Sequence, residues 1–512
     1  MPRLLLLQDF SGGLINRYSQ NLIPDNSAIF LRNARFTRKG TLTKRNGTTR
    51  TSITVASLGA INTLFAKEGS TTEELLMSDG DQVAVVGTSL ASPSSLITGL
   101  NNEWPPEFLT FNGATYMTNG NDGVRKITTN NTVSTISASP VARFHVAHRG
   151  YVHTFNQDAG GLKNRWQWSN SGDPETWTAT DFEDINPFGN SAILGAYAFG
   201  DELIVFQGPD YTGALRTYNT GKMYRILGDV FDGQNPTYSI EPIELPPDVG
   251  LLGPAHRSIK ALKGVLYFVT NRGIFAYKQG GGMPESVSEA IGGDIDQWEK
   301  ADINTAIRNP AGAIWKDEYY LSMYNPTYSA DTYNNRLYVL DRNGNIFQDI
   351  IDDGSDSNVA GGGTGSSFAI FNGGLYGCTG HSSLLRQWDV SGQSETQDDG
   401  TSGGVNLSFL SKEFDFKRKV EITHLYVHLK RQSAGTLTFI VNTDQRGDTS
   451  NSISMSTPDT GDVANSSSAV LRQKVNVGRP CRTIQFRAHD LSSNDVEIYA
   501  TEVWGKEIIG ND

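Results

Sequence analysis

The stretch GVLYFVTNRGIFAYK, residues 264–278, shows the local pattern on which the fold depends. Residues 265–269 are β-branched, aromatic or leucine, as is typical of a strand that is buried on both faces. The tripeptide Asn271-Arg272-Gly273 is a turn sequence, and residues 274–278 resume the apolar and aromatic pattern. Two such runs joined by a short turn predict an antiparallel hairpin.

Similar hairpin units recur along the chain, about seven of them between residues 58 and 400. The others lie at residues 75–86, 111–127, 151–168, 200–207, 317–324 with 336–347, and 373–388. Hairpins in series are typical of a β-propeller, in which each blade packs against its neighbours in a ring. We therefore predict an all-β fold with a propeller-like body over residues 58–390, and a pair of long β-sandwiches is the alternative. Only residues 287–306 suggest helix, interrupted by Gly292-Gly293.

The sequence after the body indicates a linker and a second domain. Residues 391–404, SGQSETQDDGTSGG, are polar and glycine-rich, as is typical of a linker. Beyond them, alternating apolar segments predict a C-terminal antiparallel β-sandwich over residues 405–512. The strands expected there are residues 407–416, 422–430, 436–442, 469–475, 483–488 and 496–504.

The N-terminal 57 residues read as an extended, basic arm. No acidic residue lies between Asp25 and Glu68. The basic residues that we expect to serve assembly are Arg32, Arg35, Arg38, Lys39, Lys44 and Arg45. We predict that this arm holds a neighbouring subunit, so that removing residues 1–50 blocks assembly and leaves the body folded. A strand that closes the chain's own propeller is the alternative.

Charge is distributed unevenly along the chain. Residues 1–57 carry a net charge of +7 and residues 405–512 are neutral, so the total of −12 leaves −19 for residues 58–404. An acidic body argues against tight phosphate binding, which needs clustered Lys and Arg. The two cysteines, Cys378 and Cys481, are expected to be buried apolar residues in a reducing compartment. With no export signal and no long apolar segment, we expect a protein made in the cytoplasm.

Motifs for catalysis or for cofactors are absent from the sequence. It contains no phosphate-binding loop, no His-Glu-x-x-His and no nucleophile elbow. His145, His148 and His153 form a cluster, but they lack a further ligand and are better interpreted as surface or interface histidines than as a metal site. Asp341-Arg342-Asn343-Gly344-Asn345 predicts a hairpin turn, because its glycine is misplaced for a calcium loop. We expect no cofactor and no enzyme.

One alternative function is a propeller that binds or cleaves carbohydrate. The turn at residues 171–177, SGDPETW, resembles an incomplete Asp-box of sialidase-type propellers. Glycoside hydrolysis needs two carboxylates that face a sugar across a pocket. Asp181, Glu183 and Asp184 are the candidates, but nothing in the sequence places them in a cleft.

Two segments resemble tail proteins of tailed bacteriophages. The first is the arm, with Gly12-Gly13, Leu31-Arg32-Asn33 and the basic turns that end at Gly40 and Gly47. The second is residues 168–206, which contain the Gly-Asp-Pro-x-x-Trp pattern. The best-matching role is that of the tail nozzle, or tail tubular protein B, of short-tailed phages, although several nozzles are much longer. A minor tail protein of a long-tailed phage is another possibility.

The resemblance implies a structural virion protein that forms a homohexameric ring. Such a ring lies below the adaptor and portal, contacts tail fibre, spike or needle proteins, and continues the DNA ejection channel. An acidic wall suits such a channel, because it repels passing phosphates. Residues 244–254, ELPPDVGLLGP, are either an ordinary inter-blade connection or a constriction in the channel. The candidate channel residues are Pro246, Pro247, Val249, Leu251 and Leu252.

Overall fold

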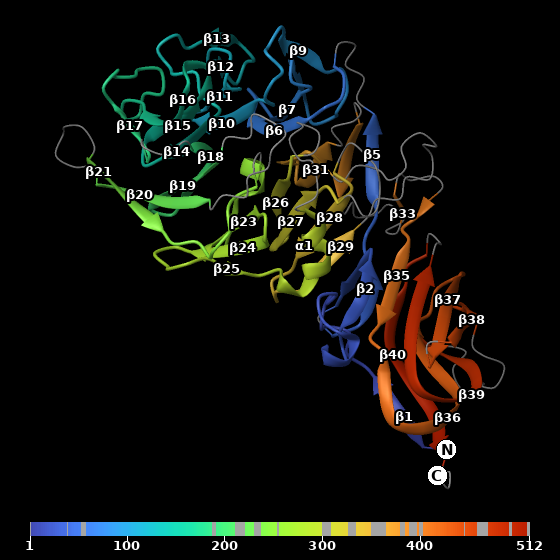
Figure 1. Ribbon diagram of the computed structural model, residues 1–512. Coiled ribbons are helices and arrows are strands. Elements are labelled where there is room, and N and C mark those ends of the chain that lie inside the picture. The colour runs from blue at the N-terminus through green and yellow to red at the C-terminus, as the bar shows by residue number, and fades with distance from the viewer. Residues whose placement is uncertain are drawn as a thin grey trace.

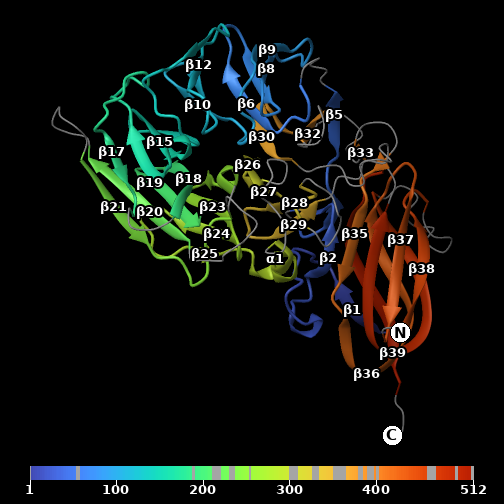
Figure 2. The same cartoon turned by 45° about the horizontal axis from the view of Figure 1, so that its top comes forward.

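The body of the protein is a β-propeller. The computed structural model describes residues 2–37, 39–52, 58–186, 191–209, 221–229, 237–252, 255–298, 309–325, 334–349, 365–378, 384–388, 397–398, 403–444, 446–457, 469–490 and 494–508. In these residues, seven sheets form the blades and an eighth, ten-stranded sheet forms the C-terminal domain. Figure 2 shows the blades arranged around a common centre, with the C-terminal sheet at one side. The predicted all-β fold with a propeller body is confirmed, and paired sandwiches do not form the body.

The first six blades are four-stranded antiparallel sheets whose strands follow chain order. Blade 1 comprises β6 (Thr63–Glu68), β7 (Glu73–Ser78), β8 (Val83–Val86) and β9 (Ser94–Ile97). Blade 2 comprises β10 (Glu107–Phe111), β11 (Ala114–Thr118), β12 (Arg125–Ile127) and β13 (Val133–Thr135). Blade 3 comprises β14 (Phe144–His148), β15 (Tyr151–Gln157), β16 (Leu162–Trp168) and β17 (Phe182–Asp184). Blade 4 comprises β18 (Ser191–Phe199), β19 (Glu202–Pro209), β20 (Lys222–Asp229) and β21 (Thr237–Ile243). Blade 5 comprises β22 (Lys260–Leu262), β23 (Val265–Thr270), β24 (Gly273–Lys278) and β25 (Glu285–Ser286). Blade 6 comprises β26 (Ala311–Trp315), β27 (Glu318–Met323), β28 (Arg336–Leu340) and β29 (Ile346–Asp349).

Blade 7 is completed by the N-terminal part of the chain (Figure 1). It contains β30 (Ser367–Phe371), β31 (Gly374–Cys378) and β32 (Leu384–Trp388), and β5 (Thr48–Ser52) pairs with β32 as the fourth strand. The short strands β33 (Gln397–Asp398) and β34 (Gly403–Gly404) extend this sheet. They are the only parts of the predicted linker, residues 391–404, that the structure describes. A ring closed by strands from both ends of the chain leaves no gap between the first and last blades.

Tight turns set the register of the blades. In blades 2 to 7 the first two strands are joined by two-residue turns, as in the pairings Phe111↔Ala114 and Phe371↔Gly374. Both residues of the Asn112-Gly113 turn have positive φ, 47° and 73°, and so do those of Asn372-Gly373, 46° and 71°. Type I′ turns require this conformation, which glycine and asparagine adopt at little cost. The predicted turn after Asp341 is also confirmed, with Gly344 at φ 85°.

The C-terminal domain is a single antiparallel sheet that folds over on itself. Its strands after the propeller are β35 (Leu407–Ser411), β36 (Phe414–Lys430), β37 (Thr436–Thr443), β38 (Arg446–Ser454), β39 (Val470–Asp490) and β40 (Glu497–Glu507). The first half of β39 pairs with β36, and its second half pairs with β35 and β37. The long β39 therefore passes from one layer to the other, and the apolar faces of both layers enclose a core.

Four strands of this sheet come from the N-terminal arm. They are β1 (Arg3–Leu7), β2 (Ala28–Arg32), β3 (Ala34–Phe36) and β4 (Leu42–Lys44). β1 and β4 pair with β40, and β2 pairs with β35, so the arm lies along the C-terminal strands in Figure 1. Together with β5, these pairings place the arm in the chain's own two domains. Removing residues 1–50 would take strands from both sheets, so the expectation of an intact body after that deletion needs revision.

The helical content is small. The 3-10 turns are η1 (Gln20–Leu22), η2 (Asp158–Gly160), η3 (Ala255–Ser258) and η4 (Glu289–Ile291), and the one α-helix among the described residues is α1 (Gly292–Trp298). The two glycines that we expected to interrupt a helix are instead its first turn. The arm packs against this first turn. The Asn16 backbone N–H donates to the Ala290 carbonyl, and the Asn16 side-chain oxygen accepts a hydrogen bond from Gly293 N–H. Residues 299–306 lie outside the described part of the chain.

Candidate functional site

The centre of the propeller is occupied by η3, which precedes blade 5. Arg257 of η3 is buried, and its guanidinium donates to acceptors on blades 1, 2 and 7 or on the segments that lead into them. These acceptors are Glu107 Oε1 (2.8 Å), Asn62 O (2.8 Å), Thr63 Oγ1 (2.8 Å), Pro106 O (3.0 Å) and Ser366 O (3.4 Å). The planar guanidinium suits this role, because it directs several N–H donors in fixed directions.

The residues on either side of Arg257 contact the remaining blades. The His256 ring packs on Phe144 of blade 3 with centroids 4.4 Å apart, and its Nδ1 accepts from Ala196 N–H of blade 4 at 3.4 Å. The Ser258 carbonyl accepts from the Tyr319 hydroxyl of blade 6 at 2.8 Å. Residues 256–258, which we call the hub segment, therefore contact all the other blades. Polar contacts of this segment close the propeller axis.

Glycines on two inner strands make room for the hub segment. A Cβ added at Gly312 would lie 2.9 Å from the Ser258 carbonyl oxygen, and one at Gly195 would lie 2.9 Å from Ile259 Cδ1. Both distances are shorter than side chains tolerate. Gly312 thus lets β26 approach the backbone of the hub segment, and Gly195 leaves room for the side chains of Ile259 and His256.

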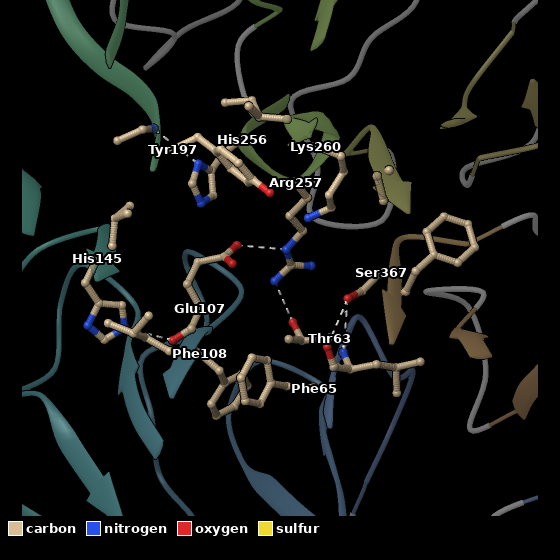
Figure 3. Close-up of a pocket in the computed structure, with 18 of the residues that line it drawn as sticks. Thr63, Phe65, Glu107, Phe108, His145, Tyr197, His256, Arg257, Lys260 and Ser367 are labelled. Atoms are coloured by element: carbon tan, nitrogen blue, oxygen red, sulfur yellow. Dashed lines mark hydrogen bonds and ion pairs between the residues drawn. The ribbon is translucent and has the colours of Figure 1, made fainter. Parts of the chain in front are cut away.

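A pocket of about 380 Å³ remains beside the hub segment (Figure 3). Residues of the first strand of every blade line it, so it lies on the propeller axis. Its titratable side chains are Glu107, His145, Tyr197, His256, Arg257 and Lys260. The volume falls in the range of small-molecule sites.

Burial and ion pairing set the charges in this pocket. Burial alone would raise the pKa of Glu107, but the positive charge of Arg257 holds it below the usual value. Burial lowers the pKa of His145 and of His256 to about 4, so both imidazoles are neutral at pH 7. Burial also lowers the pKa of Lys260, and the charge of Glu107 opposes that shift.

The pocket does not contain the pair of carboxylates that glycoside hydrolysis requires. Glu107 is the one carboxylate among its described lining residues, and it is bound to Arg257. The carboxylates considered from sequence lie elsewhere, on or beside the outer strand β17 of blade 3. Asp184 forms a two-pronged ion pair with Arg165, at 2.8 and 2.9 Å, and none of the three lines the axial pocket.

The clustered histidines are buried, so their interpretation as surface residues was wrong. The exposed fractions of His145, His148 and His153 are 7, 8 and 0%. They lie on the hairpin of β14 and β15, where alternation places them on the packed faces of blade 3. The Trp166 indole N–H donates to His153 Nδ1 at 3.0 Å. Among the described residues, no group of three or more His, Cys, Asp or Glu side chains could hold a metal ion.

The basic residues of the arm bind the chain's own acidic groups. Nη1 and Nη2 of Arg35 donate to the two carboxylate oxygens of Asp349 in blade 6. Lys44 forms a buried ion pair with Asp490 of β39. Arg45 Nε donates to Asn33 Oδ1 at 3.0 Å within the arm and lies 3.9 Å from Asp349 Oδ1. These three cations therefore fasten the arm between the propeller and the C-terminal sheet.

The other predicted arm cations are placed differently. Arg32 is partly buried on β2, in the C-terminal sheet. Lys39 is exposed in the turn between β3 and β4, and Arg38 lies outside the described residues. Contact between the arm and a neighbouring subunit remains a prediction.

A second pocket, of about 420 Å³, lies where the arm meets blade 6 and the C-terminal sheet. Arg35, Lys44 and Arg45 line it together with acidic residues that include Glu318 and Asp349. Burial raises the pKa of Glu318, although the positive charge of Arg35 opposes the shift. Arg35 and Arg45 contact Asp349, and Lys430 contacts Asp495 and Glu497, so charges from the arm, blade 6 and the C-terminal sheet meet at this junction.

The proposed channel residues are mainly internal. Val249, Leu251 and Leu252 are buried in the hydrophobic core, and Leu251 forms an isolated bridge with Thr270 of blade 5. Pro246 is half-buried and Pro247 is exposed. The segment contacts blade 5, and whether Pro247 reaches a channel in an assembly remains a prediction.

Cys378 and Cys481 are both buried and unpaired, as expected. Cys378 lies on blade 7 and Cys481 on β39. Within the described residues, no helix is long and apolar enough to cross a membrane.

Neither a protein-family model nor a curated protein matches the sequence. Several solved structures resemble the fold. One chain of a mitotic checkpoint complex is 12% identical, with a TM-score of 0.37, and the match covers 68% of this chain and 93% of that one. BamB from Moraxella catarrhalis is 10% identical, with a TM-score of 0.35 and coverage of 70 and 96%. A glycoside hydrolase is 10% identical, with a TM-score of 0.28 and coverage of 90 and 99%. At these values the similarities assign no function.

Proposed function

We propose that the chain is a structural, non-enzymatic subunit of a bacteriophage tail, in which a ring of copies forms a nozzle for DNA ejection. The observation that carries the proposal is the closed hub. Because Arg257 binds across the axis, nothing as wide as a DNA duplex passes through the propeller itself. A DNA channel must then lie between copies, which a closed ring provides.

Charge supports this arrangement. Residues 58–404 carry −19, and the arm cations Arg35 and Lys44 are neutralised within the chain. Where such a ring turns part of this acidic body toward its channel, the wall repels phosphate, so that DNA slides without binding. The arm strands pair with both the propeller and the C-terminal sheet and so join the two domains within one subunit.

The finer assignments come from the sequence resemblance. They are a homohexamer, a position below the adaptor ring, contact with fibre, spike or needle proteins, and synthesis in the host cytoplasm before incorporation into the virion. The minor tail protein of a long-tailed phage is the related alternative.

Mass spectrometry of purified phage particles made from the genome that encodes the chain tests the role. We expect the chain in several copies per particle, and cryo-electron microscopy should then show a ring around the tail channel. Particles that lack the chain overturn the proposal. A ring at another height of the tail, or in a long-tailed particle, selects the related alternative instead.

A further inference from the structure

One amine of the axial pocket has no direct hydrogen bond or ion pair with a described residue, although the charge of Glu107 acts on it. Glu107 and Arg257 neutralise each other through their 2.8 Å contact. Lys260, at the start of β22, also lines the pocket, but its amine forms no hydrogen bond or ion pair with any described residue. Figure 3 shows the Lys260 amine beside the Arg257 side chain, with His256 and Glu107 on the other side of Arg257. A partly buried ammonium without a partner favours binding of one negative charge.

The surrounding groups are suited to hydroxyls. His145 Nε2 lies 3.4 Å from the Glu107 carbonyl oxygen, so a neutral imidazole that donates there keeps Nδ1 as an acceptor. His256 Nδ1 accepts from Ala196 N–H, which leaves Nε2–H as a donor. Arg257 occupies Oε1 of Glu107, and Oε2 has no hydrogen bond with any described residue. The pocket thus presents an ammonium, the His256 imidazole donor and the Glu107 carboxylate oxygen as an acceptor.

The same groups restrict the kind of anion. A phosphate dianion would face the Glu107 carboxylate, and like charges at short distance repel. A carboxylate brings one charge, which matches the single unpaired ammonium. The rings of Phe65, Phe108 and Phe368 add apolar surface around the polar centre. Such surface packs against the C–H face of a small carbon skeleton.

We propose that the axial pocket binds a small hydroxylated monocarboxylate, such as a uronic acid, with its carboxylate on Lys260 and its hydroxyls on Glu107 and His256. The pocket binds this ligand without cleaving it, because it holds a single carboxylate. This inference goes beyond the structural role and does not depend on it.

Isothermal titration of the full chain with glucuronate, gluconate, glucose and inorganic phosphate tests the proposal. We expect saturable binding of at least one of the two hydroxy carboxylates and much weaker binding of glucose and phosphate. Preference for glucuronate identifies a sugar-acid unit, and preference for gluconate identifies a free hydroxy acid. If neither carboxylate binds, or if glucose or phosphate binds equally well, the proposal is wrong.

Two variants locate the site. Lys260→Met keeps the aliphatic stem and removes the charge, and should weaken binding about tenfold or more. Lys278→Met is the matched control, because Lys278 is exposed at the end of β24 in the same blade; it should leave affinity unchanged.

Ala147→Leu fills the pocket from β14 without altering any charge. It should abolish binding while the melting temperature stays near that of the unmodified chain, which keeps the test valid if Lys260→Met folds poorly. Binding that survives Ala147→Leu, or that a folded Lys260→Met leaves unchanged, excludes this pocket. Neither result bears on whether the chain forms a ring in particles.

Discussion

Arg257 and Glu107 are 150 residues apart in the sequence and meet at the propeller axis, where Arg257 Nε lies 2.8 Å from Glu107 Oε1. The contact joins the segment before blade 5 to the inner strand of blade 2. Burial penalises both charges, and the pair with its added hydrogen bonds to backbone carbonyls offsets that penalty. The hub therefore depends on all the blades closing around it.

Replacing Arg257 with Met should destabilise the fold by about 3–5 kcal/mol, because Glu107 and several carbonyls would be left without donors. Chemical denaturation followed by circular dichroism measures the change. The double variant Arg257→Met/Glu107→Gln should recover part of the loss, since no charge is then left unpaired. Arg342→Met in the exposed turn before β29 is the control, with a change within about 0.5 kcal/mol. A small effect at Arg257 would show that the hub contributes little to stability.

Buried histidines should make the protein sensitive to acid. The pKa of His153 is lowered by burial to about 3, from an ordinary value of 6.5. The folded state keeps this ring neutral while the unfolded state protonates it, so its contribution is present above pH 6.5 and is lost as pH falls toward 3. At about 1.36 kcal/mol per pKa unit, the loss is on the order of 5 kcal/mol.

His153→Asn tests this pH dependence. Asparagine can still accept from the Trp166 indole but does not titrate, so the midpoint of acid unfolding should move to lower pH. The partly exposed His424 is the comparison, and His424→Asn should move the midpoint less. Equal shifts in the two variants would contradict the assignment.

Removing the arm should disrupt both domains. Deletion of residues 1–52 takes away β1 to β5, which pair within the C-terminal sheet and blade 7. We expect loss of cooperative unfolding and rapid hydrogen exchange in β32, the partner of β5. Deletion of residues 1–8 removes only the edge strand β1 and should cost much less. Native exchange in β32 after the longer deletion would argue that blade 7 does not need β5.

Two lysines of the arm should differ in how much they contribute to the stability of the fold. Lys44 pairs with Asp490, and their side chains are 0 and 1% exposed. Lys44→Met should cost about 3–5 kcal/mol by leaving Asp490 buried and unpaired. Lys39→Met, at an exposed turn, should change stability by less than about 0.5 kcal/mol. If assembly rather than folding uses the arm, Lys39→Met is the variant that impairs incorporation into particles, which western blotting of purified particles measures.

Local features were predictable from the sequence. The hairpin at residues 264–278, the turn at Asn343-Gly344 and the strands after residue 405 follow from alternation and turn residues, which act over a few positions. The hub was not predicted, although HRSIK at residues 256–260 places an arginine and a lysine three positions apart in an otherwise acidic body. That cluster was the available signal for both Arg257 and Lys260.

The sequence by itself determined the hairpins, their turns and the all-β class, because φ preferences and side-chain alternation are properties of short segments. Only the tertiary structure decided the seven-bladed closure by β5, the destination of the arm cations and the meeting of Arg257 with Glu107. These features depend on contacts between residues 150 or more positions apart, whose partners become neighbours only once the ring has closed.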